Sequence, residues 1–477
     1  MTEPPWQRPT HDDPVVTSLS EAVGGPAGEH ARPHRWWTPV RVLLALFTLV
    51  FALALVQKYP CGETHWSDTD VRYGKMCYSD IPYLYTGRGF AEHRWPYATD
   101  DGRYPVMEYP VGISYLAWGV SEVIRPLVTG PAYEIRSHLD PDQLWGLPGM
   151  AQEVNEYFLL SALALFLCGL GAVLFLAGAS PGRPWEAAAF AVSPVLLVTA
   201  LVNWDLLAVL FTAGALWAFA RGRPGLTGVM IGLGTAAKLY PAFLLGAVLV
   251  DVLWAARHRR TDLRTCLLRF AGCAAAAVAT WLLVNLPAMI SGPDAWRVFW
   301  RFNTDRGADL GSLWLVLTQH GVAVPTAVVN DVSTVVFALA CVAILVLGIR
   351  APTRPRMAQI GFLVVAAFLL VNKVYSPQYV LWLLPLAVLA RPRWRDLLIW
   401  QAGELLYFGA VWLYLGGWLE PAAGGPVWAY HLAILLRVGA ELYLVALVVR
   451  DVARGSGGHV TRSTRRRVPA RVGTLAP

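Results

Sequence analysis

Acidic side chains alternate with aromatic side chains in one polar stretch of the chain, residues 61–131. The acids are Asp68, Asp70, Asp80, Glu92, Asp100, Asp101 and Glu108, and the rings include Trp66, Tyr78, Tyr83, Tyr85, Trp95, Tyr97, Tyr104 and Tyr109. Aromatic rings stack on the faces of sugars, and a carboxylate can take a proton from a hydroxyl group. The stretch therefore favours sugar chemistry, with an ordinary loop of solvated acids as the alternative.

The composition is that of a membrane protein. Of the 477 residues, 56% are hydrophobic and only 15% are charged, whereas a soluble domain has about 25% charged residues. The sequence therefore predicts an all-α polytopic membrane protein. The net charge of +7 comes from short loops and the C-terminal tail, and no nucleic-acid-binding motif is present, so nucleic acid is excluded as a partner.

Apolar runs predict about 12 transmembrane helices. They cover residues 40–56, 154–178, 185–202, 206–220, 226–237, 241–255, 267–287, 334–349, 357–371, 379–390, 397–415 and 428–449. Every alternate loop is rich in arginine, which indicates that these loops and both termini face the cytoplasm of a cell-membrane protein.

The same loop charges decide the place of residues 111–123, which are apolar enough to suggest another span. If they crossed, every later basic loop would face outside, so we expect an interfacial helix or a segment that dips into the membrane and returns. Residues 58–153 then form one large external loop, and residues 288–330 form a second. The transmembrane domain is expected at 39–451, between a disordered cytoplasmic tail at 1–38 and a basic cytoplasmic tail at 452–477.

Cys61 and Cys77 both lie in the large loop, so an oxidising exterior would allow them to form a disulfide. The other four cysteines lie in or beside apolar segments, as small core residues do. The spacing of Cys61 and Cys77 is not that of a metal site. The sequence leaves a divalent cation open as a cofactor but gives no clear ligand set for one, and no other cofactor is assigned.

Four cationic side chains are expected on the external side, where lysine and arginine are disfavoured. They are Lys238, Arg301, Arg306 and Lys373. Their position favours a phosphate clamp just above the bilayer. The alternatives are that the lysines snorkel to the surface and that neighbouring aspartates neutralise the arginines.

No Walker loop, dinucleotide fingerprint, HExxH motif or haem motif is present. An enzyme that acts outside the membrane has no nucleotide sugar there. A sugar linked to a lipid phosphate is therefore the natural donor, with its tail between helices and its phosphate held by lysine and arginine.

Short motifs between residues 77 and 385 carry a family resemblance. They read CYSDIPYLYTGRGF, EYPV, NWDLLAV, GLGTAAKLYPAFLL, RGADLGSLW and NKVYSPQYVLWLLP. With them the sequence resembles the GT-C membrane glycosyltransferases and, more closely, the polyprenyl-phosphate-mannose-dependent mannosyltransferases of glycosyltransferase family 87 from actinobacteria. It departs mildly at Tyr109-Pro110-Val111, where many such enzymes read YPP.

The resemblance implies a GT-C-like bundle that moves mannose from polyprenyl phosphate to a hydroxyl of an external glycan or lipoglycan, with inversion. It implies Asp80 as the base, with Asp70 and Asp68 as alternatives because Asp68-Thr69-Asp70 looks like a DxD motif. The four cations would stabilise the phosphate. The residues expected to position sugar or acceptor are Glu108, Tyr109, Asn203, Asp205, Tyr240 and Gln378.

Three alternatives remain at this point. The nearest is an arabinofuranosyl or other hexosyl transferase of the same fold. The second is a transporter or lipid flippase, although no internal repeat of the kind common in transporters is visible. The third is a scaffold of the cell envelope, which would not need the carboxylate of Asp80.

Overall fold

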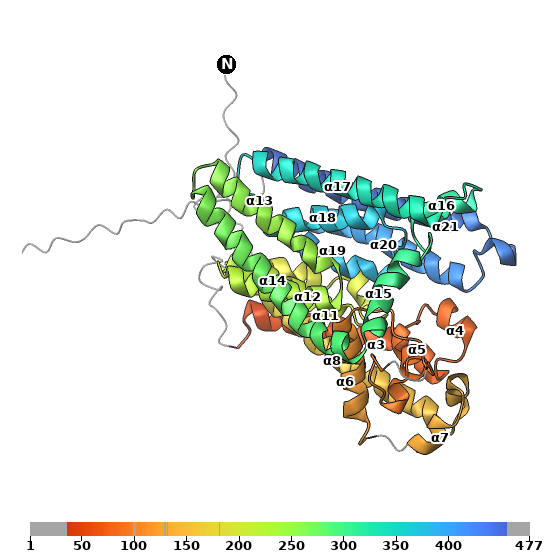
Figure 1. The fold of residues 1–477 in the computed structure, drawn as a ribbon. Helices are drawn as coiled ribbons and strands as arrows, with labels where there is room; N and C mark the ends of the chain where they lie inside the picture. Colours follow the sequence, from red (N-terminus) through yellow and green to blue (C-terminus); the bar gives the residue numbers. More distant parts are fainter. Residues whose placement is uncertain (1–35, 99–101, 128–129, 131, 181, 456–477) are drawn as a thin grey trace, which may run out of the picture.

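The computed structural model describes residues 36–98, 102–127, 130, 132–180 and 182–455, and every regular element among them is a helix (Figure 1). The prediction of an all-helical polytopic membrane protein is confirmed. Seven stretches of the described chain are long and apolar enough to cross a membrane. They are α3 Pro39–Glu63, α8 Met150–Ala179, η4 Tyr240–Phe243 with α13 Leu244–Arg257, α14 Leu263–Ser291, α17 Thr326–Arg350, α20 Trp394–Leu415 and α21 Val427–Arg454.

Shorter apolar helices complete the bundle, so the predicted number of twelve spans is not established by helix length. They are α6 Val111–Ile124, α11 Leu206–Ala220, α12 Pro224–Ala237, α18 Met357–Val371 and η5 Pro377–Tyr379 with α19 Val380–Ala390. Most of the predicted tails at 1–38 and 452–477 lies outside the described residues, namely residues 1–35 and 456–477. Helix α21 runs past the predicted domain end at 451.

The predicted span at 185–202 is not one continuous helix. It is divided into η3 Pro184–Ala187, α9 Ala188–Ala191 and α10 Pro194–Thr199. The break falls at Ser193, because the residue before a proline is pushed out of the helical region. Ser193 then caps α10 by accepting a hydrogen bond from the backbone N–H of Leu196.

Residues 64–149, called here the first loop, fold into short helices at one end of the bundle (Figure 1). Beside α6 they are α4 Thr69–Gly74, α5 Asp80–Gly87, η1 Phe90–Glu92, α7 Tyr133–Ser137 and η2 Pro141–Gly146. The loop is held to α8 by Glu153, which pairs with buried Arg136 at 2.6 Å and accepts a hydrogen bond from Tyr85 at 2.5 Å. The buried carboxylate of Glu153 thus has an ion-pair partner and a further hydrogen-bond donor. A buried polar network whose members are hydrogen-bonded is rigid, so this one holds the first loop against α8.

The predicted interfacial segment forms α6, a helix of 14 residues that packs against α8, α12 and α14. The second predicted external loop holds α15 Pro293–Asp305 and α16 Leu313–Gln319, and η6 Pro421–Ala423 lies between α20 and α21. Helix α15 leads away from the end of α14 and lies near the first loop (Figure 1).

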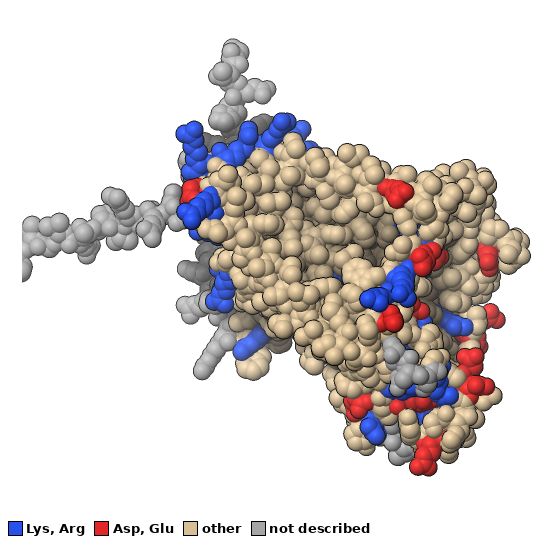
Figure 2. Space-filling model, viewed as in Figure 1, with Lys and Arg blue, Asp and Glu red and all other residues tan. Residues whose placement is uncertain are grey.

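Charge is sorted along the bundle. Figure 2 shows Lys and Arg gathered at the end where α13 passes into α14, which we call the basic end. Asp and Glu gather at the opposite end, around the first loop, together with some Lys and Arg. We call this second end the loop end. Such sorting is typical of a membrane protein whose basic end faces the cytoplasm.

Cys61 and Cys77 form a disulfide that ties the end of α3 to the residues before α5. Replacing both cysteines by serine should lower the stability by about 3 kcal/mol, because the unfolded chain gains freedom when a loop of this length opens. Thermal unfolding of the purified protein measures this, with Cys341→Ser as the control because Cys341 is a free cysteine. An unchanged melting temperature in the double variant would contradict a structural role for the bridge.

Candidate active site

A cavity of about 800 Å³ lies at the loop end of the bundle. Its walls come from the first loop, α15, α17, α18, α19 and α20, and from the connection between α18 and η5. Polar and charged side chains share these walls with aromatic rings, among them Trp300, Trp382 and Trp412. A space of this size accommodates a sugar and a phosphate with room for a second reactant.

Asp80 lines the cavity at the start of α5. Its backbone N–H donates to the carbonyl of Val202 at 2.7 Å, which anchors the first loop to the turn before α11. Its two carboxylate oxygens accept hydrogen bonds from the hydroxyls of Tyr78, at 2.8 Å, and Tyr109, at 2.6 Å. The carboxylate is therefore held in one orientation.

Burial raises the pKa of Asp80 above its ordinary value, and the charge of Asp205 adds to the rise. The two tyrosine hydroxyls and the charge of Lys238 act in the opposite direction on this pKa. A carboxylate with a raised pKa is a better base than an ordinary aspartate, provided that it is ionised at the working pH.

Lys238 and Asp205 form a buried ion pair beside Asp80. Lys238 follows the last residue of α12, and its Nζ lies 3.1 Å from Oδ1 of Asp205 and 4.3 Å from the centre of the Tyr109 ring. The other oxygen of Asp205 accepts a hydrogen bond from Trp382 at 2.8 Å. The charge of Lys238 is thus largely matched by Asp205. Lys238 is therefore better placed to hold the carboxylates of Asp205 and Asp80 than to bind a phosphate by itself.

Asn203 links this pair to Asp80. Its Oδ1 accepts from the backbone N–H of Asp205 at 2.9 Å, and its Nδ2 donates to the Tyr109 hydroxyl at 3.3 Å. Tyr109 in turn donates to Asp80. The predicted positioning residues Tyr109, Asn203 and Asp205 therefore lie in one connected network around the candidate base.

Arg306 and Lys373 also line the cavity. Arg306 follows α15 and donates twice to one oxygen of Asp309, at 2.6 and 3.0 Å. Nζ of Lys373 donates to two neutral oxygens, the carbonyl of Thr304 at 3.1 Å and the side chain of Asn330 at 2.7 Å. Burial and the positive charge of Arg306 lower the pKa of Lys373. An anion placed between two neighbouring cations would relieve this repulsion.

Three other predicted residues lie in or beside the cavity. Glu108 lines it and pairs with Arg88 at 2.5 Å. Gln378 lines it with a buried Oε1 that meets no hydrogen-bond donor in the part of the chain that the structure describes. Tyr240 lies behind the wall, stacked on Trp382 at 5.0 Å between ring centres. Gln378 therefore has an acceptor that is free for a ligand hydroxyl.

The structure does not bring the remaining predicted residues to the cavity. Asp68 caps α4 by accepting from the backbone N–H of Val71, and Asp70 is exposed in the first turn of that helix. Arg301 is exposed and lines a separate depression with Arg88 and Arg94. Of the three aspartates considered for the base, Asp80 is the one whose side chain lines the cavity.

Sequence reasoning did not assign Tyr78, Asn330 or Trp382 to the site. Tyr78 stands two residues before Asp80, and a hydroxyl so close to the candidate base was a usable signal. Trp382 reaches Asp205 across 177 residues of sequence, and Asn330 reaches Lys373 across 43. No local pattern could have paired these residues.

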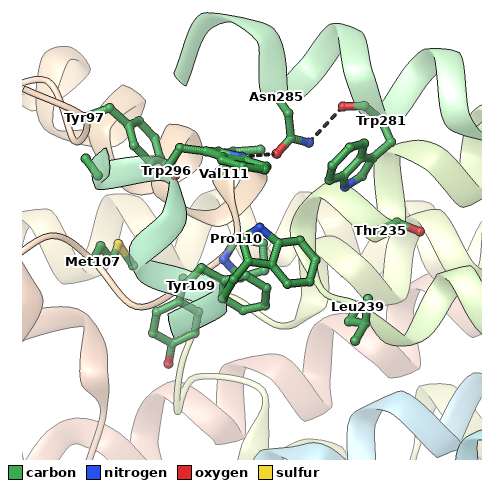
Figure 3. A pocket seen from close by; sticks show the side chains of 13 residues that line it. Tyr97, Met107, Tyr109, Pro110, Val111, Thr235, Leu239, Trp281, Asn285 and Trp296 are labelled. Atoms are coloured by element: carbon green, nitrogen blue, oxygen red, sulfur yellow. Dashed lines mark hydrogen bonds between the residues drawn. The ribbon is translucent and has the colours of Figure 1, made fainter. Parts of the chain in front are cut away.

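A small pocket adjoins the cavity between α14, α15 and α6 (Figure 3). Nε1 of Trp296 donates to Asn285 at 2.9 Å, and the amide of Asn285 donates to the carbonyl of Trp281 at 2.8 Å. Tyr109 and Pro110 belong to the walls of both spaces. The hydrogen bonds therefore fix α15, one wall of the larger cavity, to α14.

Among the described residues no cluster of three or more His, Cys, Asp or Glu side chains is arranged to hold a metal ion. Asp80 and Asp205 are the carboxylates that share the central network, and both are already held by hydrogen bonds or by Lys238.

Comparison with known proteins finds a family model that matches part of the chain. Residues 148–372 match the model of glycosyltransferase family 87, and no curated protein sequence matches the chain. A solved structure of ArnT from Cupriavidus metallidurans bound to undecaprenyl phosphate is similar with a TM-score of 0.40 and 16% sequence identity, over 85% of this chain and 77% of that one. At that score the likeness assigns neither a site nor a ligand. The matched region covers just under half of the chain and includes Asn203, Asp205, Lys238 and Arg306, and over this region the chain is similar to glycosyltransferase family 87.

Proposed function

We propose that the protein transfers mannose from a polyprenyl-phosphate donor to a hydroxyl of a glycan or lipoglycan outside the cell membrane, with inversion at the anomeric carbon. The loop end would face outside, and both termini would lie in the cytoplasm. One observation carries the proposal: the oriented carboxylate of Asp80 shares a cavity of about 800 Å³ with the cations Arg306 and Lys373. The family match supports glycosyl transfer as the reaction.

In the proposed reaction, Asp80 takes the proton of the acceptor hydroxyl as its oxygen attacks the anomeric carbon. The bond between that carbon and the phosphate oxygen breaks on the opposite face, and polyprenyl phosphate leaves with the electron pair. Lys373 and Arg306 stabilise the charge that develops on the leaving phosphate, so no general acid is needed. Attack from the opposite face inverts the anomeric configuration.

The walls of the cavity support a lipid-linked donor. Phe337 of α17 and Phe368 of α18 line it, and their rings lie 5.6 Å apart between centres. Helix α17 is one of the stretches long enough to cross a membrane. A prenyl chain could therefore lie against apolar rings at membrane depth while its phosphate reaches Lys373 at the loop end.

The tyrosine hydroxyls should set the acid limb of the pH profile. Asp80 acts as a base only when ionised, so activity should fall as the pH falls through its raised pKa. Because the hydrogen bond from Tyr78 lowers this pKa, Tyr78→Phe should move the acid limb to higher pH. The measurement is kcat/KM against pH.

The matched control is Tyr83→Phe, because the Tyr83 hydroxyl donates to the carbonyl of Trp66 and not to Asp80. A pH profile that moves equally in both variants, or moves to lower pH in Tyr78→Phe, would contradict the assigned role of Asp80.

The donor sugar is tested by offering purified protein a series of polyprenyl-phosphate sugars with one acceptor. We expect mannose to be transferred and arabinofuranose and glucose to be transferred poorly. The product should carry an α linkage when the donor is β-linked, as seen by NMR of the anomeric proton. Faster transfer of arabinofuranose than of mannose would contradict mannose as the donor sugar. A retained anomeric configuration would contradict the single-displacement mechanism.

A further inference from the structure

A second cavity, of about 680 Å³, lies at the basic end of the bundle. The two cavities lie at opposite ends of α12 and α18. The first residues of both helices line the second cavity, and the residues that follow α12 and the last residue of α18 line the active-site cavity. At 1.5 Å per residue, the two cavities are roughly 20 Å apart along these helices. The proposed transfer reaction does not use this second space.

Four arginines from three places in the sequence line it. They are Arg223 before α12, Arg269 on α14, and Arg354 and Arg356 before α18. Of the described residues in its lining, Asp251 is the only acid, and it binds Arg354 through two hydrogen bonds of 2.6 and 2.7 Å. The cavity therefore has an excess of positive charge after its one acid is matched.

Arg356 is half-buried, whereas the other three arginines of this cavity are exposed. Its NH2 group donates to the carbonyl of Ala390 at 2.8 Å. Within the part of the chain that the structure describes, its Nε is buried and meets no hydrogen-bond acceptor. A buried donor without an acceptor is costly, and an anionic oxygen in the cavity would satisfy it.

The rest of the lining is apolar. Leu216 and Phe219 of α11, Val248 of α13, Met357 of α18 and Leu389 of α19 belong to it. A site with cations beside apolar walls, at the basic end of a membrane protein, matches a lipid headgroup and chain better than a soluble anion. Positive-inside bias alone would place arginine in solvated loops here, and it does not require a cavity or a buried Nε.

We propose that this cavity binds an anionic phospholipid, with the phosphate on Arg269, Arg356 and Arg223 and an acyl chain against the apolar wall. The lipid would connect α12, α14 and α18 at the basic end. Two of these helices lead at their other ends into the active-site cavity, to Lys238 and Lys373. Binding should therefore stabilise the folded protein without any contact with the reacting groups.

The test is thermal unfolding and native mass spectrometry of the purified full chain in neutral detergent. Phosphatidylglycerol, phosphatidylcholine and inorganic phosphate are added in separate arms. We expect phosphatidylglycerol to bind and raise the melting temperature, and the other two to do neither. Protection by inorganic phosphate to the same degree would overturn the assignment to a lipid, and equal protection by phosphatidylcholine would overturn the role of the arginines.

Variants localise the site. Arg269→Gln and Arg356→Gln should each weaken phosphatidylglycerol binding about fivefold, because each basic group near a lipid phosphate contributes about that factor. Arg264→Gln is the matched control, since Arg264 is exposed on the same helix as Arg269 and outside the cavity. An equal loss in Arg264→Gln would show a diffuse surface effect and overturn the site.

A gain-of-binding variant keeps the proposal testable if an arginine variant folds poorly. Asp251→Asn removes the acid that matches Arg354, so it should tighten phosphatidylglycerol binding severalfold. Unchanged or weaker binding in a folded Asp251→Asn protein would contradict the proposed position of the phosphate.

Discussion

Replacing Asp80 by asparagine should lower the rate of sugar transfer by about a thousandfold, because a positioned general base contributes about 10² to 10⁴ in rate. Asparagine has nearly the same shape and can still accept a hydrogen bond from Tyr78 or Tyr109, so the loop should remain folded. The loss should appear in kcat. The measurement is initial-rate kinetics of transfer by the purified variant, with its melting temperature recorded in parallel.

The matched control is Asp70→Asn. Asp70 lies in the same loop, but it is exposed on α4 and does not line the cavity. We expect this variant to keep near-native transfer. A large loss in Asp70→Asn with little loss in Asp80→Asn would move the base to the DxD-like motif and contradict the assignment made from the structure.

Replacing Lys373 by glutamine should lower kcat by about a hundredfold, because Lys373 would stabilise charge that grows on the leaving phosphate as the bond breaks. Its present partners, Thr304 and Asn330, are neutral oxygens, so removal leaves no buried acid unpaired. Arg306→Gln should have a smaller effect, since Asp309 already matches part of its charge. Steady-state kinetics with the lipid-linked donor measure both.

Arg297→Gln is the control for general electrostatic effects, because Arg297 is exposed on α15, pairs with Asp294 and does not line the cavity. A rise in KM with unchanged kcat in Lys373→Gln would indicate ground-state binding of the donor in place of leaving-group stabilisation. Unchanged kinetics would remove Lys373 from the phosphate site.

The fold class could be predicted from the sequence because hydropathy and loop charge act locally. A run of apolar residues predicts a membrane helix wherever it occurs, and alternate basic loops predict which end of each helix faces the cytoplasm. The break at Ser193 was readable in principle from Pro194, but the apolar run around it predicted one span. Composition reports burial in the membrane and does not report whether a helix is continuous.

The candidate site was predictable in part. Residue type and side of the membrane predicted a phosphate clamp that includes Lys238 and Lys373, and the family resemblance implied Asp80 as the base. Whether Asp68, Asp70 or Asp80 faces the cavity depends on how α4 and α5 pack, which no local motif records. The pairing of Lys238 with Asp205 likewise depends on two connections meeting in space. In the structure Lys238 pairs with Asp205 and lines the cavity, whereas its role towards a phosphate stays a prediction.

The central claim is transfer of a sugar from a lipid phosphate by the carboxylate of Asp80. It is tested most directly by giving purified protein in liposomes radiolabelled polyprenyl-phosphate-mannose and a mannoside acceptor, with Asp80→Asn as the blank. The account predicts label on the acceptor with the native protein and almost none with the variant. Equal transfer by both proteins would contradict the role of Asp80, and label transferred only from a nucleotide sugar would contradict the donor.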